Sequence, residues 1–211
     1  MSESSETETV SPADVKSDCY SARERAVMVL TQQFRGWLFG PLLRLLARCG
    51  IKPDHLTLLS TLVGLSFCPL FLWSKPFAFT MLALHVLLDG LDGPLARSMG
   101  VASRKGSFTD TMSDQLIVVA STVTLMFTET IGIVPGGVYI FAYTVVVLFA
   151  MVRNALSIPY SWLVRPRFVL YVWFVVETYH FPGTINYVLW FFNILLAVKM
   201  LTGFIKIRKR I

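Results

Sequence analysis

Charge and cysteine are both scarce in this chain. Only 15% of its 211 residues are charged and 55% are hydrophobic, a composition too apolar for an ordinary soluble domain. The three cysteines, Cys19, Cys49 and Cys68, show neither paired spacing nor a C-x-x-C motif, so we expect neither disulfide bonds nor a zinc site. The N-terminal residues are polar and acidic, and we therefore expect no cleavable signal peptide.

Long apolar stretches make up most of the chain. They cover residues 55–73, 77–99, 108–128, 138–160, 168–181 and 185–205. Several contain the ~20 residues that a helix needs to cross a hydrocarbon core, and they are apolar on all sides, whereas β-barrel strands alternate apolar and polar residues. We predict an all-α membrane protein built as a six-transmembrane helix bundle. The fifth stretch is short, and tilting or extension by neighbouring residues would let it cross.

The segments before this bundle differ from it in composition. Residues 1–20 are rich in Ser, Thr and Glu, as in a disordered acidic tail. Residues 21–50 mix arginines with leucines and aromatic residues, which predicts an amphipathic interfacial helix region, interrupted near Gly40-Pro41. A basic helix on a soluble domain is the alternative for this region. Residues 51–211 would form the six-span domain.

Basic residues are concentrated at one end of the predicted spans. They occur before the first span, around the second connection, between the fourth and fifth spans and after the last: Arg44, Arg48, Lys52, Arg97, Arg104, Lys105, Arg165, Arg167, Lys206, Arg208, Lys209 and Arg210. By the positive-inside rule, both termini and the 98–107 connection should be cytoplasmic. A net charge of +6 also suits nucleic acid, but charges beside the spans favour membrane lipids of an anionic leaflet. We therefore predict no nucleic-acid partner.

Four aspartates interrupt the apolar stretches. Asp89 and Asp92 are three residues apart. Asp110 and Asp114 are four apart, so each pair shares one face of its helix. The second and third spans are antiparallel and joined only by the 98–107 connection, which brings the two pairs to a similar depth. A carboxylate within a span costs at least ~2.5 kcal/mol and indicates a functional site.

The acid cluster offers only oxygen ligands. Such ligands, without His or Cys, suit hard cations such as Mg²⁺, Mn²⁺ or Ca²⁺. These ions commonly act with substrate phosphates, and two of them can clamp both sides of a phosphoryl displacement. Gly93 and Gly106 lack side chains where a ligand or a facing helix must approach, and Arg97 offers a planar cation for phosphate. The acids therefore predict a site for two divalent ions and a phosphate-bearing substrate.

The spacing of these residues resembles the signature of the CDP-alcohol phosphatidyltransferases. The motif is Asp89-x2-Asp92-Gly93-x2-Ala96-Arg97-x8-Gly106-x3-Asp110-x3-Asp114, and all eight positions match in identity and spacing. The stretch Lys52-Pro53-Asp54-His55-Leu56-Thr57 is similar to a Pro-Asn-x-x-Thr opening that many members have before the first span. Asp54 stands where those members have Asn.

This resemblance implies an enzyme that moves a phosphatidyl or phosphoalcohol group from a CDP-linked donor to an alcohol and releases CMP. It also implies a six-helix bundle, commonly a homodimer. Asp89, Asp92 and Asp110 would hold the divalent metals. Asp114 would be a further ligand or neighbour of the metals, and the catalytic base that deprotonates the acceptor hydroxyl. The CDP donor would be bound by Gly93, Ala96, Arg97, Gly106 and Thr57.

Three other polar residues of the spans have weaker functional signals. His85 lies four residues before Asp89 and would contact it or the donor, the alternative being an ordinary packed histidine. Arg153 and Asn154 would bind an acceptor or donor phosphate, because an arginine within a span usually faces a polar interior. The alternative for Arg153 is a side chain that snorkels to the interface.

Polar residues near the ends of the spans are harder to interpret. Ser157, Arg165 and Arg167 would close the acceptor side, but arginines in connections more often only determine topology. Glu129 and Glu177 are expected at the outer ends of spans, where water can reach them.

The motif leaves the substrates open. The leading prediction is phosphatidyl transfer from CDP-diacylglycerol to a small polar alcohol. Transfer of phosphocholine or phosphoethanolamine to diacylglycerol uses the same motif, and the short chain favours the first. Members that take a phosphorylated acceptor often have a basic residue after the last aspartate; here it is Gln115, so serine or another neutral-headed alcohol stays open. A cation transporter is an alternative from another class, but it would leave Gly93, Arg97 and Gly106 without a role. A structural membrane protein is a third alternative, which the four acids disfavour.

Overall fold

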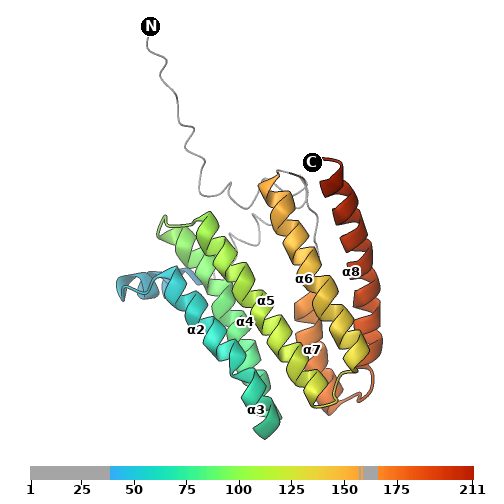
Figure 1. The fold of residues 1–211 in the computed structure, drawn as a ribbon. Coiled ribbons are helices and arrows are strands. Elements are labelled where there is room, and N and C mark those ends of the chain that lie inside the picture. Colours follow the sequence, from blue (N-terminus) through green and yellow to red (C-terminus); the bar gives the residue numbers. More distant parts are fainter. Residues whose placement is uncertain (1–38, 157, 159–165) are drawn as a thin grey trace.

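The computed structural model describes residues 39–156, 158 and 166–211, and all regular structure in them is helical. Residues 39–48 form a helix. It is followed by α2 (Pro53–Leu65), α3 (Phe67–Trp73), α4 (Lys75–Ser98), α5 (Arg104–Phe127), α6 (Ile133–Ala155), α7 (Pro166–Tyr179) and α8 (Ile185–Arg208) (Figure 1). The prediction of an all-helical protein is confirmed for these residues. The predicted tail, most of the 21–50 region, Ser157 and Arg165 lie outside them.

Four of the helical segments are long and apolar enough to cross a membrane. Among the described residues these are Pro53–Trp73, which joins α2 and α3, Lys75–Ser98, Ile133–Ala155 and Ile185–Arg208. α5 carries two aspartates of the motif. α7 has 14 residues, about 21 Å of helix against a hydrocarbon core of about 30 Å. The chain is thus an integral membrane protein with four candidate spans in the part that the structure describes.

Local hydrogen bonds fix the hairpin between α4 and α5. Gly100 follows α4 with a φ of +68°, a left-handed conformation that glycine adopts without strain. Its N–H donates to the carbonyl of Arg97 at 3.1 Å. Ser103 is the N-cap of α5, and its hydroxyl accepts the backbone N–H of Gly106 at 3.1 Å. These bonds reverse the chain, so the acidic segments of both helices lie at the same end of the bundle (Figure 1).

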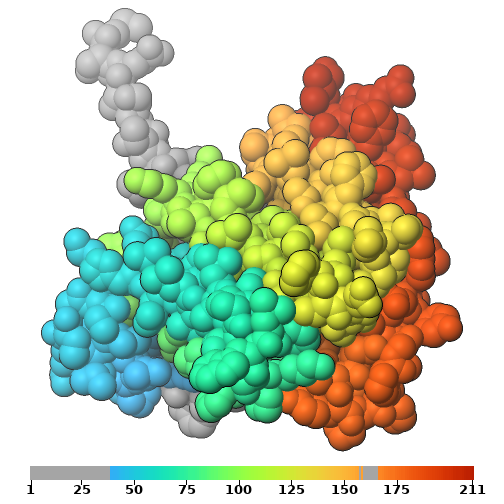
Figure 2. Space-filling view, turned by 60° about the horizontal axis from the view of Figure 1, so that its bottom comes forward, coloured from blue at the N-terminus to red at the C-terminus, as the bar shows by residue number. Residues whose placement is uncertain are grey.

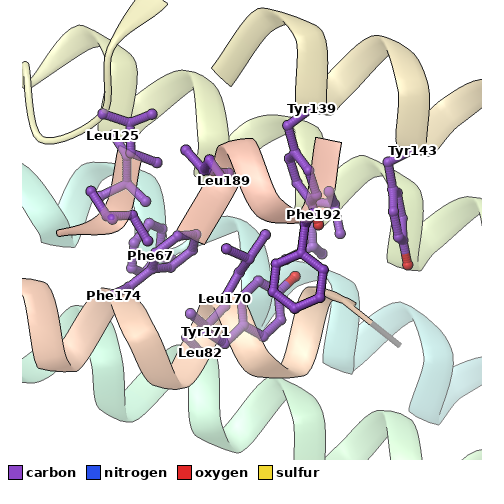
Figure 3. Packing of buried hydrophobic residues seen from close by; sticks show 14 of the residues in the cluster. Phe67, Leu82, Leu125, Tyr139, Tyr143, Leu170, Tyr171, Phe174, Leu189 and Phe192 are labelled. Atoms are coloured by element: carbon purple, nitrogen blue, oxygen red, sulfur yellow. The ribbon is translucent and has the colours of Figure 1, made fainter. Parts of the chain in front are cut away.

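Two apolar clusters hold the bundle together. The larger contains residues of every helix from α3 through α8, among them Phe67, Leu82, Leu125, Tyr139, Leu170, Phe174, Leu189 and Phe192 (Figure 3). The smaller consists of Leu43, Leu56, Leu91 and Leu95 and ties the 39–48 helix to α2 and α4. Because Leu91 precedes Asp92 directly, this second cluster anchors the turn of α4 that carries the acid.

α2 packs closely against both α4 and α5. A Cβ on Gly64 would lie 2.8 Å from Cδ1 of Ile117 on α5 and 3.0 Å from Cγ of His85 on α4. His85 is 1% exposed, and its Nδ1 lies 3.0 Å from the carbonyl oxygen of Ser60 on α2. His85 is thus packed against α2, as the packed-histidine alternative predicts, with its Nδ1 contact to α2.

Glu177 near the end of α7 is buried, contrary to the prediction that water reaches it. Its carboxylate accepts the backbone N–H groups of Gly183, Thr184 and Ile185. Trp173 donates its indole N–H to Oγ1 of Thr184 at 3.0 Å. The prediction was wrong because the carboxylate caps the start of α8, where backbone amides replace water. Figure 2 turns this end of the bundle forward, with the α7–α8 connection beside the α5–α6 connection.

Candidate active site

Three of the four predicted acids converge at one point. Asp89 and Asp92 on α4 and Asp110 on α5 each place a carboxylate oxygen within 4.8 Å of the other two. Asp92 is 7% exposed, and the other two are half-buried. Three like charges this close repel one another strongly in a weakly polar environment, and a cation between them would offset this repulsion.

Thr57 connects α2 to this cluster. Its hydroxyl lies 2.8 Å from Oδ2 of Asp92 and 3.2 Å from the carbonyl oxygen of Pro53. A hydroxyl has one proton to donate, and the shorter contact to a carboxylate is the stronger bond. Thr57 therefore orients the Asp92 carboxylate. Asp54, which stands at the position of the family's Asn, is exposed in the first turn of α2.

The fourth acid, Asp114, lies outside the three-carboxylate cluster and pairs with Arg167. Nη1 of Arg167 contacts Oδ1 of Asp114, and its Nη2 lies 3.2 Å from Oδ2 of Asp89. Arg167 is the second residue of α7 and is 2% exposed. Arg167 therefore does more than mark topology, because carboxylates of α4 and α5 compensate its charge inside the bundle.

The remaining residues of the signature leave room beside the acids. A Cβ on Gly93 would meet only the guanidinium of Arg97, with Nη1 at 3.5 Å. A Cβ on Gly106 would meet only Oγ of Ser103, at 3.4 Å. No helix among the described residues approaches either glycine, so close helix packing is not the reason for them here. Ala96 is half-buried on the same segment.

The two phosphate-binding candidates of α6 point in different directions. Arg153 is 5% exposed, whereas the next residue, Asn154, is exposed, because successive helical residues are turned by about 100°. Figure 1 shows the C-terminal end of α6 at the same end of the bundle as the α4–α5 connection. Arg153 is therefore directed into the bundle at the end where the acids lie.

The acid cluster fits a hard divalent cation. It provides three carboxylates and no nitrogen or sulfur ligand among the residues that the structure describes, which is the ligand chemistry that Mg²⁺ and Mn²⁺ prefer. The bond from Thr57 to Asp92 is of the kind that orients ligands from the outer coordination shell. Asp89, Asp92 and Asp110 are the residues that can hold such an ion.

The residues of this site fall within a known family domain. A family model described as CDP-alcohol phosphatidyltransferase matches residues 51–205. The chain belongs to the CDP-alcohol phosphatidyltransferase family. The match includes Thr57, the whole acidic signature, Arg153 and Arg167, and it leaves out the residues before 51.

The curated relatives of this family member match over part of their length. A CDP-diacylglycerol–serine O-phosphatidyltransferase from Mycobacterium leprae is 32% identical over 109 residues, which cover 50% of this chain and 36% of the relative. An archaetidylinositol phosphate synthase from Pyrococcus horikoshii is 39% identical over 72 residues, which cover 34% and 38%. The matched segments thus span little more than a third of these relatives, whose names specify different acceptors.

Solved structures support the fold of this family member. The crystal structure of phosphatidylinositol phosphate synthase (PgsA1) from Mycobacterium tuberculosis with CDP-DAG bound gives a TM-score of 0.69. The alignment covers 79% of this chain and 92% of that one, at 21% identity. The same synthase in complex with manganese and citrate also gives 0.69, with 79% and 87% covered, at 21% identity. At this identity the likeness establishes the helical membrane fold.

Sequence reasoning named Arg167 only for the acceptor side and missed its pairing with Asp89 and Asp114. A charge balance offers the signal that would have found it, because four carboxylates in spans call for a buried cation. Arg167 stands directly after Pro166, at the start of a predicted span. An arginine at the first turn of a helix can reach the interior as readily as the interface, and the nearby acids decide between the two.

Proposed function

We propose that this family member transfers a phosphatidyl group from CDP-diacylglycerol to a small polar alcohol and releases CMP. The convergence of Asp89, Asp92 and Asp110 within the eight-position signature carries this proposal. The named activities of the relatives support a CDP-diacylglycerol donor, since one is a CDP-diacylglycerol–serine O-phosphatidyltransferase. The related synthase was solved with CDP-DAG bound.

We propose that the acid cluster binds two divalent ions, Mg²⁺ or Mn²⁺, with Asp114 beside them. When bound, such ions neutralise the donor diphosphate and stabilise the charge that develops on its oxygens. The manganese-bound structure of the related synthase supports a divalent ion. In this chain Thr57 orients one ligand and Arg167 contacts another.

In the proposed reaction the acceptor hydroxyl oxygen attacks the phosphorus that is bonded to the diacylglycerol. The bond from this phosphorus to the bridging oxygen of the diphosphate breaks, and CMP leaves with the electron pair. Asp114 accepts the proton of the acceptor hydroxyl. Arg97, whose guanidinium lies beside Gly93, binds phosphate oxygens of the donor through its planar fork.

The donor needs a polar site for its head and an apolar site for its tails. Gly93, Ala96, Arg97, Gly106 and Thr57 are proposed for the head. An apolar groove of about 320 Å³ lies between the 39–48 helix, α2 and α4 and is lined by Leu42, Leu46, Ile51, His55, Leu56, Leu59, Leu88 and Leu91. Two of these residues, Leu88 and Leu91, directly precede Asp89 and Asp92 on α4. We propose that one acyl chain of the donor occupies it.

The acceptor side is proposed to lie toward α6. Arg153 is a buried cation at the acidic end of the bundle, and Asn154 follows it at the surface. A buried arginine suits an acceptor with an anionic group, such as the carboxylate of serine or a phosphate. The names of the two relatives point to different head groups, serine in one and inositol phosphate in the other. An acceptor panel is therefore required.

The proposed membrane arrangement extends beyond the four apolar helices. α5 has 24 residues, about 36 Å of helix, and runs along the bundle with the others (Figure 1). We propose that α5 and α7 also cross, that both termini and the site are cytoplasmic, and that the protein is a homodimer. Accessibility of Cys49 to an impermeant thiol reagent in sealed vesicles tests the sidedness, and light scattering of the purified protein tests the dimer.

The proposed activity is tested with purified protein, Mg²⁺ or Mn²⁺, labelled CDP-diacylglycerol and a panel of alcohols. The expected result is CMP release that requires one alcohol of the panel and yields the matching phospholipid. Release of CMP only from CDP-choline or CDP-ethanolamine with diacylglycerol would show that the donor is one of these CDP-alcohols and not CDP-diacylglycerol. Failure with every donor and acceptor, together with metal uptake into sealed vesicles, would favour the transporter alternative.

A further inference from the structure

Arg167 carries a charge at a depth where an unpaired charge is costly. Its side chain is 3% exposed, and an arginine is buried only where other groups compensate its charge. The guanidinium carbon lies 4.6 Å from the centre of the Phe168 ring, a cation–π contact that helps to hold it. The partners of this arginine therefore indicate what it does.

Those partners are two acids of the signature on two different helices. Nη2 reaches Oδ2 of Asp89 on α4 at 3.2 Å, and Nη1 reaches Oδ1 of Asp114 on α5. The planar fork of a guanidinium can hold two carboxylates in a fixed relative geometry, which an ammonium group cannot do. Arg167 thus joins α7 to both acidic helices.

The pairing divides the four acids into two groups. Asp89, Asp92 and Asp110 have oxygens within 4.8 Å of one another, and Asp114 is outside this group. Asp89 belongs to both, because one of its oxygens contacts Arg167. A positive charge at this distance opposes a divalent cation on the same carboxylate.

We propose that Arg167 is a positioning residue, which fixes the Asp114 carboxylate toward the acceptor and weakens the hold of the Asp89 cluster on its divalent ion. This inference rests on the proposed function. Asp114 must accept a proton from a hydroxyl at hydrogen-bond distance, so its orientation determines the rate. A divalent ion held too tightly by the protein would leave less of its charge for the diphosphate.

The proposal predicts that removal of the Arg167 charge lowers turnover and raises the affinity for Mn²⁺. In Arg167→Gln, kcat falls by about 10²-fold, since Asp114 loses its partner. The Kd for Mn²⁺ falls about threefold to tenfold, the order of effect of one nearby charge on a divalent ion. In Arg167→Lys the Mn²⁺ affinity stays near that of the unchanged protein, and kcat recovers only in part because a flexible ammonium does not fix the relative geometry of the two carboxylates.

The experiment measures free Mn²⁺ by electron paramagnetic resonance and CMP release on the same purified variants in detergent. Arg104→Gln is the matched control, because it removes the same charge from an exposed position at the start of α5 and leaves both quantities unchanged. Weaker or unchanged Mn²⁺ binding in Arg167→Gln would overturn the proposal, as would undiminished kcat or full recovery with lysine. If the unchanged protein releases no CMP, the proposed function fails, while the Mn²⁺ measurement still decides whether Arg167 opposes the ion.

Discussion

The hydrogen bond from Thr57 to Asp92 allows a sharp test of the site. Thr57→Val removes one hydroxyl and preserves the shape of the side chain. The bond is 2.8 Å long and buried, and a hydrogen bond to a charged group contributes about 1.5–3 kcal/mol. Loss of a partner that orients a metal ligand typically costs about 10–100-fold in metal affinity or activity. We therefore expect the Kd for Mn²⁺ to rise about tenfold or more, with kcat/KM falling by a similar factor.

The assay is an Mn²⁺ titration followed by CMP release at saturating Mn²⁺. Thr61→Val is the matched control, because Oγ1 of Thr61 donates only to the carbonyl of Thr57, at 2.7 Å, one turn further along α2. Thr57→Ser, which keeps the hydroxyl, should recover most of the loss. Unchanged Mn²⁺ affinity in Thr57→Val, or an equal loss in Thr61→Val, would refute the reasoning that this hydroxyl orients the ligand.

Three further predictions concern the stability of the bundle, each measured as thermal unfolding in detergent. Glu177→Gln weakens the cap of α8 and should lower the free energy of unfolding by about 1–3 kcal/mol, with activity per folded molecule retained; unchanged stability would contradict the cap. Gly64→Ala should destabilise, because overpacking against Ile117 costs about 1–3 kcal/mol, whereas Gly137→Ala, where a Cβ meets nothing within 4 Å, should stabilise by up to about 1 kcal/mol. The same sign for both would contradict the close packing of α2. Exposed Glu129 has a φ of +56°, so Glu129→Gly should raise the free energy of unfolding by about 1 kcal/mol. A lower free energy of unfolding would show that contacts of the Glu129 side chain outweigh the backbone strain.

The sequence predicted the convergence of acids well because the argument needed only local geometry. Spacings of three and four residues place each pair on one helix face. The connection between the second and third spans is short, so these two helices can only run antiparallel, side by side. Gly100 and Ser103 then close the turn by hydrogen bonds that act within a few residues. Such features depend little on the rest of the fold.

The contacts between distant segments could not be predicted in the same way. Thr57 and Asp92 are 35 positions apart, and Arg167 and Asp89 are 78 apart; each contact depends on how whole helices pack. Apolar stretches without periodicity do not indicate which face of a helix meets which neighbour. The sequence pattern likewise predicted Glu177 near water. In the structure, the packing of α7 against α8 directs its carboxylate to the backbone N–H groups at the start of α8.

Helix ends were predicted less accurately than helix existence. The first stretch is divided at Ser66, and the fourth ends as α6 at Ala155, several residues before the predicted limit of 160. Hydrophobicity continues across both points, so composition alone does not mark them. Arg153 lies in the last turn of α6 and is buried, and the direction of its side chain depends on the packing of α6 in the bundle.

Asp114→Asn tests most directly whether the acids of α4 and α5 form the site of phosphatidyl transfer. CMP release and CDP binding are measured on the same preparation, with the unchanged protein beside it. Removal of a catalytic base is expected to lower kcat by about 10²–10⁴-fold, while CDP still binds, because the donor is proposed to contact Gly93, Ala96, Arg97, Gly106 and Thr57. CMP release at the rate of the unchanged protein would contradict the role of Asp114 as the base and the placement of the acceptor hydroxyl beside it.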